Sequence, residues 1–247
     1  MTRSAGIPLI DDANAHTALA ERDALSDRIV SLQTLTAGLA HEVRNPLNSA
    51  RLQLELLERR LRRASAAANL IDPVEQVSHE LERLTRLLND FLAFARPSRL
   101  ALANHDVRMI VGDVVAGEQP FAASRDATLQ VTGIASLRAR VDAPKLRLIA
   151  LHLVRNALEA VAPGGHVVVT VAADEDHVRL AVEDDGPGIP EASRRRVYEP
   201  FFTTKDTGTG LGLSIVHAMV AAHGGAVTVD SAPGKTRFDV ALPRHPA

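Results

Sequence analysis

The sequence predicts an α+β protein built in two parts, a long helical hairpin followed by a layered domain of strands and helices. Three observations support this prediction. Between residues 25 and 95, apolar side chains recur at steps of four and three, as in helices that pack along a narrow seam. Pro97 ends the pattern, because proline cannot continue a hydrogen-bonded helix. Beyond it, short valine-rich runs typical of strands alternate with two helical runs.

Composition and charge narrow the class of protein. The chain has 247 residues, enough for a sizeable buried core, and 28 Lys and Arg against 30 Asp and Glu give a net charge of -2. This balance argues against a nucleic-acid partner. The chain has no cysteine, which excludes disulfides and thiolate chemistry. No run approaches the roughly 18 apolar residues of a membrane span, and the N-terminus lacks an apolar signal segment. We therefore expect a soluble, cytoplasmic protein.

The helical part is expected to be a hairpin that dimerises. The first helix is predicted over residues 25–61 and, about ten residues later, Asp72 and Pro73 predict the N-cap and first residue of a second helix. That helix should end before Pro97. A hairpin alone leaves its seam half covered, so we expect a two-fold dimer that forms a four-helix bundle.

The second part is expected to be a largely antiparallel sheet with helices. The runs VVVTVA and VRLAVE are separated by ADEDH, which indicates a β-hairpin. Strands are predicted at 128–131, 167–172, 178–183, 227–230 and 237–242, and helices at 145–161 and 212–223. The expected organisation is a flexible lead-in over 1–24, a helical hairpin over 25–96, a linker over 97–102 and a second domain over 103–247.

One histidine of the first helix has an unusual setting. His41 lies two residues from the seam positions Leu39 and Val43, about 200° round the helix, and therefore faces away from the seam. Asn45 lies over the same face. Pro46 should bend the helix within one turn of His41, and an interior proline costs about 3 kcal/mol. This combination is unusual for a purely structural helix, and it leaves two interpretations of His41 open, a functional histidine and a solvated surface side chain.

The segment AHEVRNPLNSARLQLELL resembles the phosphoacceptor box of bacterial two-component sensor histidine kinases, and the resemblance continues to about residue 243. It implies that His41 is the phosphoacceptor, a role suited to a neutral imidazole with a nucleophilic nitrogen. It also gives Glu42 the role of base, although adjacent helical residues do not face each other, and a solvated charged face is the alternative. LNDFLAFARPSRL is similar to the nitrogen-regulation subclass.

Four later segments resemble the boxes of the Bergerat (GHKL) ATP-binding fold, and this implies an α/β-sandwich domain. In LHLVRNALEAV, Asn156 offers an amide oxygen, a hard ligand for Mg²⁺. In VEDDGPGIP, Asp184 matches the residue that accepts a hydrogen bond from the adenine amino group, and Gly186 and Gly188 let the backbone approach the base. Taken singly, Asn156 is compatible with a surface position and DDGPG with an ordinary turn.

The remaining two boxes are VYEPFFTTK and GTGLGLSIV. Gly208, Gly210 and Gly212 precede a helical run, so their N–H groups and the helix N-terminus predict an anion site suited to phosphates. Residues 199–209 are expected to form a lid, from which Lys205 reaches the phosphates or remains solvated.

The sequence departs from the family pattern at two places. His152 stands where an asparagine usually precedes Asn156 by four residues, on the same helical face, from which it can still donate to a phosphate. SAPGKTRFDVALP lacks a glycine that the family commonly carries before the threonine, so the last hairpin is expected to differ in geometry.

The resemblance implies ATP-dependent autophosphorylation of His41, with Mg²⁺ as cofactor, and transfer to an aspartate on the receiver domain of a response regulator. Glu42 and Asn45 match the pattern of regulator phosphatases, in which Asn45 would orient water. A separate sensory protein is a further candidate partner. Two alternatives stay open. One is a Bergerat ATPase or serine kinase that uses only 103–247, although no obvious carboxylate base precedes Asn156 by four residues. The other is a degenerate nucleotide- or regulator-binding scaffold, favoured by His152.

Overall fold

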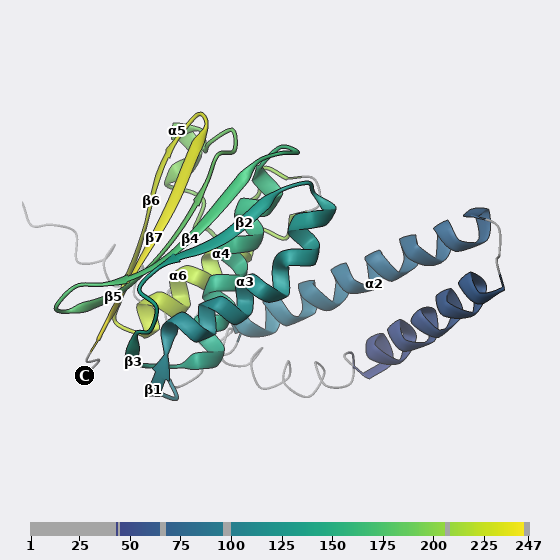
Figure 1. The fold of residues 1–247 in the computed structure, drawn as a ribbon, viewed down its shortest axis with the longest axis horizontal. Coiled ribbons are helices and arrows are strands. Elements are labelled where there is room, and N and C mark those ends of the chain that lie inside the picture. Colours follow the sequence, from purple (N-terminus) through teal and green to yellow (C-terminus); the bar gives the residue numbers. More distant parts are fainter. Residues whose placement is uncertain (1–42, 44, 65–67, 96–99, 206–207, 245–247) are drawn as a thin grey trace, which may run out of the picture. The chain divides into compact units, whose positions relative to one another are not determined.

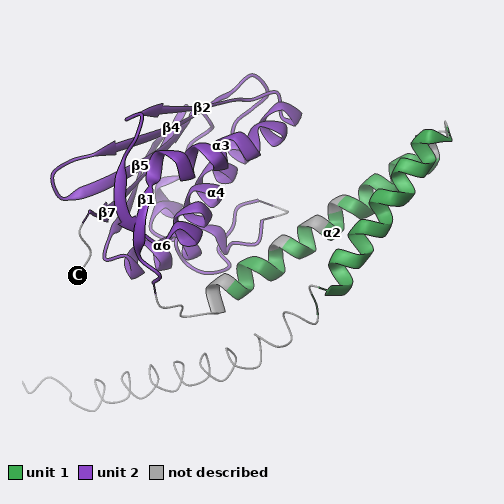
Figure 2. Cartoon of the chain, turned by 60° about the horizontal axis from the view of Figure 1, so that its bottom comes forward, with its two compact units in different colours: residues 1–96 green, residues 97–247 purple. Residues whose placement is uncertain are grey.

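The computed structural model describes residues 43, 45–64, 68–95, 100–205 and 208–244, which fall into two compact units divided between Arg96 and Pro97 (Figure 2). The predicted lead-in and the beginning of the predicted first helix, with His41 and Glu42, lie outside the described residues. Within the described ranges, no helix is both long enough and apolar enough to cross a membrane.

Unit 1 contains two helices that lie side by side, residues 45–63 and α2 (Ala68–Ala95) (Figures 1 and 2). Arg62 joins them, because its guanidinium pairs with Glu58 of its own helix at 2.8 Å and also with Glu75 of α2. Seam residues such as Leu54 and Leu81 are half-buried. Other seam residues remain exposed by 38–51%, namely Leu57, Val77, Leu84 and Phe91. The seam of this single chain is therefore only partly covered, as expected of a hairpin that dimerises.

The predicted start of the second helix is wrong. The helix begins at Ala68 instead of after Asp72, and Pro73 lies inside it. Alanine has the highest helix propensity, and the alanines at 66–68 favour an earlier start. Pro73 lies little more than one turn into the helix, where its missing N–H removes a single backbone hydrogen bond close to the N-terminal end. The first helix thus ends at residue 63 and α2 begins at Ala68, a shorter separation in the sequence than the predicted ten residues.

Unit 2 is a five-stranded sheet in the order β2-β4-β5-β7-β6, in which β2 pairs with β4 in parallel and the other pairs are antiparallel. Its strands are β2 (Thr128–Gly133), β4 (His166–Ala173), β5 (His177–Asp184), β6 (Ala226–Ala232) and β7 (Lys235–Pro243). The helices α3 (Val107–Ser124), α4 (Ala143–Ala160) and α6 (Gly212–Ala222) cover one face of the sheet (Figure 1). All five predicted strands, the hairpin and both predicted helices are confirmed to within a few residues.

The core lies between this sheet and the helices. Alternate residues of β4 are buried there, because successive strand side chains point to opposite faces. The largest side chains that are almost fully buried include Leu146, Ile149, Leu153, Leu158, Leu180, Ile215 and Leu242. The first four of these belong to α4, so this helix contributes more large buried side chains to the core than any other element.

Four elements of unit 2 were not predicted: α3, the short strands β1 (Ala103–Asp106) and β3 (Arg138–Val141), and the four-residue α5 (Glu191–Arg194). β1 and β3 pair with each other in a separate two-stranded sheet. Asp106, the last residue of β1, is also the N-cap of α3, because its carboxylate accepts a hydrogen bond from the N–H of Arg108 at 2.9 Å. The same carboxylate accepts a hydrogen bond from the hydroxyl of Ser136, which precedes β3, at 2.7 Å. These bonds, the Ser136 one foremost, lower the pKa of Asp106.

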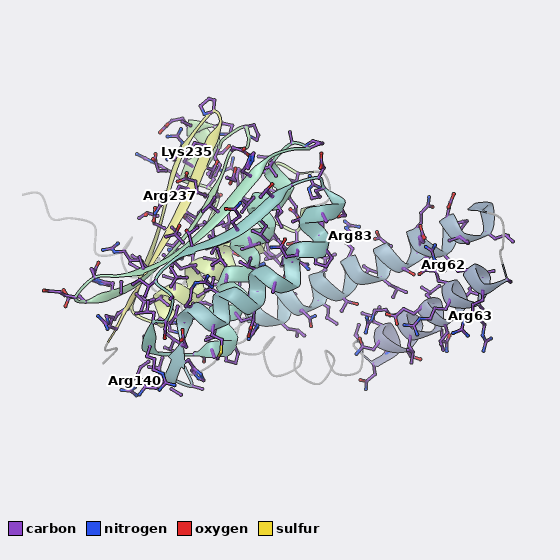
Figure 3. The ribbon with its side chains drawn as sticks, viewed as in Figure 1. Arg62, Arg63, Arg83, Arg140, Lys235 and Arg237 are labelled. Carbon is purple, nitrogen blue, oxygen red and sulfur yellow. The ribbon has the colours of Figure 1, made fainter. Side chains whose placement is uncertain are left out.

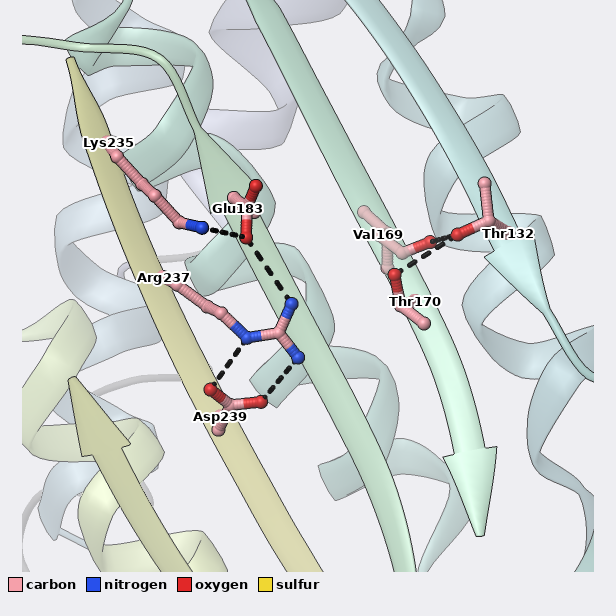
Figure 4. Close-up of polar contacts among 7 residues, drawn as sticks. All are labelled: Thr132, Val169, Thr170, Glu183, Lys235, Arg237 and Asp239. Carbon is pink, nitrogen blue, oxygen red and sulfur yellow. Dashed lines mark hydrogen bonds and ion pairs between the residues drawn. The ribbon is translucent and has the colours of Figure 1, made fainter. Parts of the chain in front are cut away.

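Polar side chains occupy part of the sheet between β5 and β7. Arg237 donates to Asp239 at 2.8 Å and to Glu183 at 3.4 Å, and Lys235 pairs with Glu183 at 3.4 Å (Figure 4). The basic side chains labelled in Figure 3 are spread over both units, and Arg62, Arg83, Lys235 and Arg237 are paired with carboxylates. The positive charge at these positions is thus locally neutralised.

Candidate functional site

Helix α4 is the element on which the candidate site is built. Its start is fixed by the buried Asp142, whose Oδ1 accepts the N–H of Lys145 at 3.1 Å and whose Oδ2 accepts the N–H of Ala101 at 2.9 Å. Its apolar stripe packs into the core, whereas His152, Asn156 and Glu159 are only half-buried. These three residues are spaced by four and three positions and therefore share one face of the helix.

Three segments that are distant in the sequence meet this face of α4. At the start of α6, a Cβ added to Gly212 would lie 3.2 Å from Nδ1 of His152. Nζ of Lys205 pairs with Oε2 of Glu159 at 2.7 Å. A Cβ added to Gly186 would lie 3.1 Å from the carbonyl oxygen of Ala160. The glycine loops and the lid segment thus contact α4 on either side of Asn156 along the helix.

Asp184, the last residue of β5, is buried with only 4% of its surface exposed. Its Oδ1 accepts the N–H of Gly186 at 3.0 Å. Burial raises the pKa of Asp184 to about 6, and neighbouring acidic side chains act in the same direction. The Gly186 bond and the positive charge of Lys205 act against this rise. A ligand that donates a hydrogen bond to this carboxylate would stabilise its ionised form.

The loop after β5 is held against the turn between β6 and β7. Gly188 has a φ of 83°, and a Cβ there would lie 2.5 Å from the carbonyl oxygen of Ala232, so only glycine fits. The N–H of Ile189 donates to Ser231 Oγ at 2.8 Å, and the N–H of Gly234 donates to the Gly186 carbonyl at 3.0 Å. These contacts fix the backbone next to Asp184.

The last hairpin has a tight turn, although the chain lacks the glycine that the family commonly carries before the threonine. Ala232 pairs with Lys235, so that Pro233 and Gly234 form the two-residue connection. Gly234 has a φ of 80°, the left-handed conformation that glycine adopts without strain. Proline followed by such a glycine matches the two central residues of a type II turn.

The second glycine loop approaches the chain closely. Gly210 has a φ of 68°, and a Cβ there would lie 2.3 Å from the carbonyl carbon of Phe201. The N–H of Phe201 donates to the Gly210 carbonyl at 2.9 Å. At Gly208, a Cβ would lie 2.3 Å from Thr203 Oγ1. The following helix, α6, starts without a side-chain hydrogen bond from its N-cap Leu211, which suits an anion site at its first amides.

His152 is an electrically neutral residue at ordinary pH. Burial, reinforced by the positive charge of Arg155, lowers the pKa of His152 to about 4, and Glu159 opposes the shift. A neutral imidazole has one donor and one acceptor nitrogen, the same two capacities as the amide of an asparagine. The replacement of the usual asparagine therefore keeps the hydrogen-bonding character of this position without adding charge.

Sequence reasoning did not single out two residues that shape this site. Glu159 pairs with Lys205, and its spacing of three from Asn156 was the available signal. Arg125 donates to the carbonyl oxygens of Leu158 at 2.7 Å and Glu159 at 3.4 Å, and so holds the last turn of α4. Nothing in the local sequence around Arg125 indicates a partner more than thirty positions away.

The structure divides the predicted site residues between the two units. Asn156, His152, Asp184, Lys205 and the glycines at 186, 188, 208, 210 and 212 belong to unit 2. Asn45 belongs to unit 1, where it is exposed on the helix of residues 45–63. His41 and Glu42 are outside the described ranges, so their roles stay predictions.

Comparisons with known proteins agree with this arrangement. The family of histidine kinase-, DNA gyrase B- and HSP90-like ATPases matches residues 141–246, and the His Kinase A (phospho-acceptor) domain matches residues 31–99. The chain thus combines a phosphoacceptor domain with an ATPase domain of the GHKL class, and it belongs to the sensor histidine kinase family.

Individual relatives are similar to this chain over 60–88% of its length. The sensor histidine kinase ZraS of Escherichia coli (strain K12) is 33% identical over 219 residues, which is 88% of this chain and 46% of ZraS. The crystal structure of full-length ShkA in complex with AMPPNP has a TM-score of 0.70 and 32% identity, covering 86% of this chain and 46% of that one. The mycobacterial sensor histidine kinase MprB has a TM-score of 0.53 and 32% identity, covering 60% of this chain and 100% of that one. The chain spans about a third to a half of the curated relatives it matches.

Proposed function

We propose that this chain is an ATP-dependent protein histidine kinase that phosphorylates His41 and passes the phosphoryl group to an aspartate of a response regulator. The observation that carries the proposal is the meeting of two glycine loops and the lid segment along the face of α4 that bears Asn156. The match of residues 31–99 to the phosphoacceptor domain supports His41 as acceptor. The solved ShkA structure holds AMPPNP, which supports a nucleotide in the site of unit 2.

The residues of unit 2 fit ATP and Mg²⁺. Asp184 would accept a hydrogen bond from the adenine amino group, and Gly186 and Gly188 would lie next to the base. The phosphates would lie against the start of α6 and the glycines at 208, 210 and 212, positions at which a side chain would come into close contact with neighbouring parts of the chain. Lys205 and the neutral His152 would be further hydrogen-bond donors to the phosphates. The amide oxygen of Asn156 would hold Mg²⁺, whose charge neutralises the triphosphate when it is bound.

Phosphoryl transfer requires little covalent chemistry from the protein, whose main contributions are positioning and charge neutralisation. A ring nitrogen of His41 attacks the γ-phosphorus, the bond to the β,γ-bridging oxygen breaks, and ADP leaves. Glu42 would take the proton of the other ring nitrogen and fix its tautomer. An aspartate oxygen of the regulator then displaces the imidazole from phosphorus. The domain boundaries proposed for this cycle are 25–96 and 103–247, joined by a linker at 97–102.

A regulator phosphatase activity is the second proposed function. Asn45 is exposed one turn beyond His41 in the sequence, where its amide can orient water towards a docked aspartyl phosphate. An Asn45→Ala variant should leave autophosphorylation intact and lengthen the lifetime of the phosphorylated regulator in the presence of ADP. An unchanged lifetime relative to wild type would remove this function.

Labelling separates the kinase from its alternatives. Incubation with γ-labelled ATP should give phosphate on the protein that is acid-labile and base-stable, and His41→Gln should abolish it while the dimer persists. Release of inorganic phosphate without labelling would identify an ATPase, and acid-stable labelling a serine kinase. Binding of ATP with neither outcome would identify a scaffold. The proposed partners are a second copy of this chain, a response regulator and a separate sensory protein. The subclass proposed for the kinase is the nitrogen-regulation subclass.

A further inference from the structure

Lys205 and Glu159 form an ion pair between the lid segment and α4. Nζ of Lys205 lies 2.7 Å from Oε2 of Glu159, and the two residues are 46 positions apart in the sequence. The side chains are 37% and 33% exposed, so the pair is only partly shielded from water. In this structure, the lysine proposed to bind phosphate is thus already paired with a carboxylate.

The backbone at Lys205 is fixed by its own turn. The N–H of Lys205 donates to Thr203 Oγ1 at 3.1 Å, and the N–H of Gly208 donates to the Lys205 carbonyl at 3.2 Å. Gly208 in turn approaches Thr203 so closely that a Cβ would lie 2.3 Å from Oγ1. The turn therefore determines where the Lys205 side chain starts, and its ammonium group reaches Glu159 from there.

The backbone at Glu159 is fixed as well. Arg125 holds its carbonyl oxygen at 3.4 Å and that of Leu158 at 2.7 Å. Glu159 follows Asn156 by three positions on the same face of α4, so its carboxylate lies on the side of the helix proposed to face the phosphates. A negative charge at that place repels a bound triphosphate and attracts the lysine that the triphosphate needs.

We propose that Glu159 sets the affinity and release of nucleotide by competing with its phosphates for Lys205. The inference rests on the proposed ATP site. A nucleotide must exchange the Glu159 contact of Lys205 for a phosphate contact, and ADP, which lacks the γ-phosphate, offers less in that exchange. Glu159 therefore lowers the affinity for both nucleotides, and it returns Lys205 to α4 when the product leaves.

Calorimetric titration of the full chain with ATP and with ADP, in the presence of Mg²⁺, tests this proposal. Glu159→Gln removes the charge and keeps the size, and it should tighten ATP binding about two- to fivefold, the range expected for losing a partly exposed ion pair. The gain should shrink at 0.5 M salt, since salt screens exposed charges. Asp113→Asn is the matched control, because it also removes a carboxylate paired on the surface of unit 2, with Arg147 at 3.0 Å, and it should leave the affinity unchanged.

A double-variant cycle isolates the lysine. Lys205→Met should weaken ATP binding, and in that background Glu159→Gln should lose most of its gain. Weaker ATP binding by Glu159→Gln alone would overturn the proposal, because Glu159 would then position Lys205 instead of competing for it. An equal gain with and without Lys205, or no gain, would also overturn it. If Asp184→Asn leaves the ATP affinity unchanged, the ATP site itself is misplaced, an outcome separate from the result at Glu159.

Discussion

Replacing the buried Asp184 by asparagine should stabilise the nucleotide-free protein while weakening its binding of ATP. The wild-type carboxylate is 4% exposed, and burial raises its pKa from 3.8 to about 6. Because the folded chain binds this proton more tightly, the stabilising contribution of the protonated group is complete below pH 3.8. That contribution is lost as the pH rises through about 6. Asparagine is neutral at every pH and avoids this loss.

The size of the effect follows from the shift. A rise of about two pKa units corresponds to about 3 kcal/mol of unfolding free energy between low and neutral pH. For a domain of this size, that difference corresponds to roughly 6 to 12 °C in melting temperature. The amide oxygen of asparagine can still accept the N–H of Gly186, so this backbone donor keeps its partner in the variant.

Scanning calorimetry of the full chain between pH 4.5 and 8 measures both effects. Without nucleotide, Asp184→Asn should melt above wild type at pH 8, and the two should converge towards pH 4.5. With saturating ATP and Mg²⁺ for wild type, the advantage of the variant at pH 8 should shrink towards zero, because losing a buried hydrogen bond to a charged group costs about 1.5 to 3 kcal/mol of binding. That loss is about tenfold to hundredfold in affinity.

Asp185→Asn is the matched control with the opposite sign. Asp185 accepts the backbone N–H of His166 at 2.8 Å and meets its ring nitrogen at 3.0 Å, and the backbone bond foremost lowers the pKa of Asp185. Its stabilising contribution is present above the unfolded value and lost as the pH falls, so Asp185→Asn should lower the melting temperature at pH 8. A stability difference between Asp184→Asn and wild type that does not change with pH would refute the reasoning.

Three further predictions follow from the geometry. Asn156→Asp should slow labelling of His41 more than it weakens ATP binding, because a carboxylate alters the ligand proposed for Mg²⁺; labelling rates and titration calorimetry measure the two effects, and equal losses would contradict this. Gly210→Ala should cost about 1 to 3 kcal/mol of stability and weaken ATP binding, because its Cβ would collide with Phe201. Gly164→Ala is the control: its φ is also positive, but no atom lies within 4 Å, so it should cost less stability and leave ATP binding unchanged. Leu57→Glu should give monomers in sedimentation with the helices retained, because Leu57 is 43% exposed in the single chain; a stable dimer would count against the bundle.

The sequence predicts an element well where its period is clean. Alternate valines mark β4, whereas α3 was missed although its buried residues follow helical spacing from Val107 to Ala122. Gly112, Gly117 and Pro120 weaken the helix propensity of α3, and a charged residue, Glu118, stands on its buried face. Arg155 of α4 compensates that charge at 2.9 Å, a tertiary contact 37 positions away that no local pattern contains. In α3, tertiary packing therefore outweighs the low intrinsic helix propensity of its sequence.

The candidate site shows the same division. Glycines 186, 188, 208, 210 and 212 were recognised from their motifs, and the structure gives physical reasons for several of them in the close approach of neighbouring chain. The position of Asp184 at the end of a strand was also predictable. The pairing of Lys205 with Glu159 was not, since the partners lie on a loop and a helix that meet only after folding. Sequence motifs therefore predict which residues bind, and the fold determines what these residues contact before binding.

The least favourable local features of unit 2 gather around the proposed nucleotide site. Asp184 is an acid whose burial disfavours its charge, and Phe201 has a φ of 66° with 65% of its surface exposed, a conformation and an exposure that a phenylalanine rarely combines. Neither feature stabilises the unliganded fold, so the surrounding structure must hold them in place. A donor from the base would offset the cost at Asp184, and a phosphate would take over Lys205 from Glu159. Nucleotide binding should therefore relieve the cost of the buried charge at Asp184, whereas it must break the ion pair between Lys205 and Glu159.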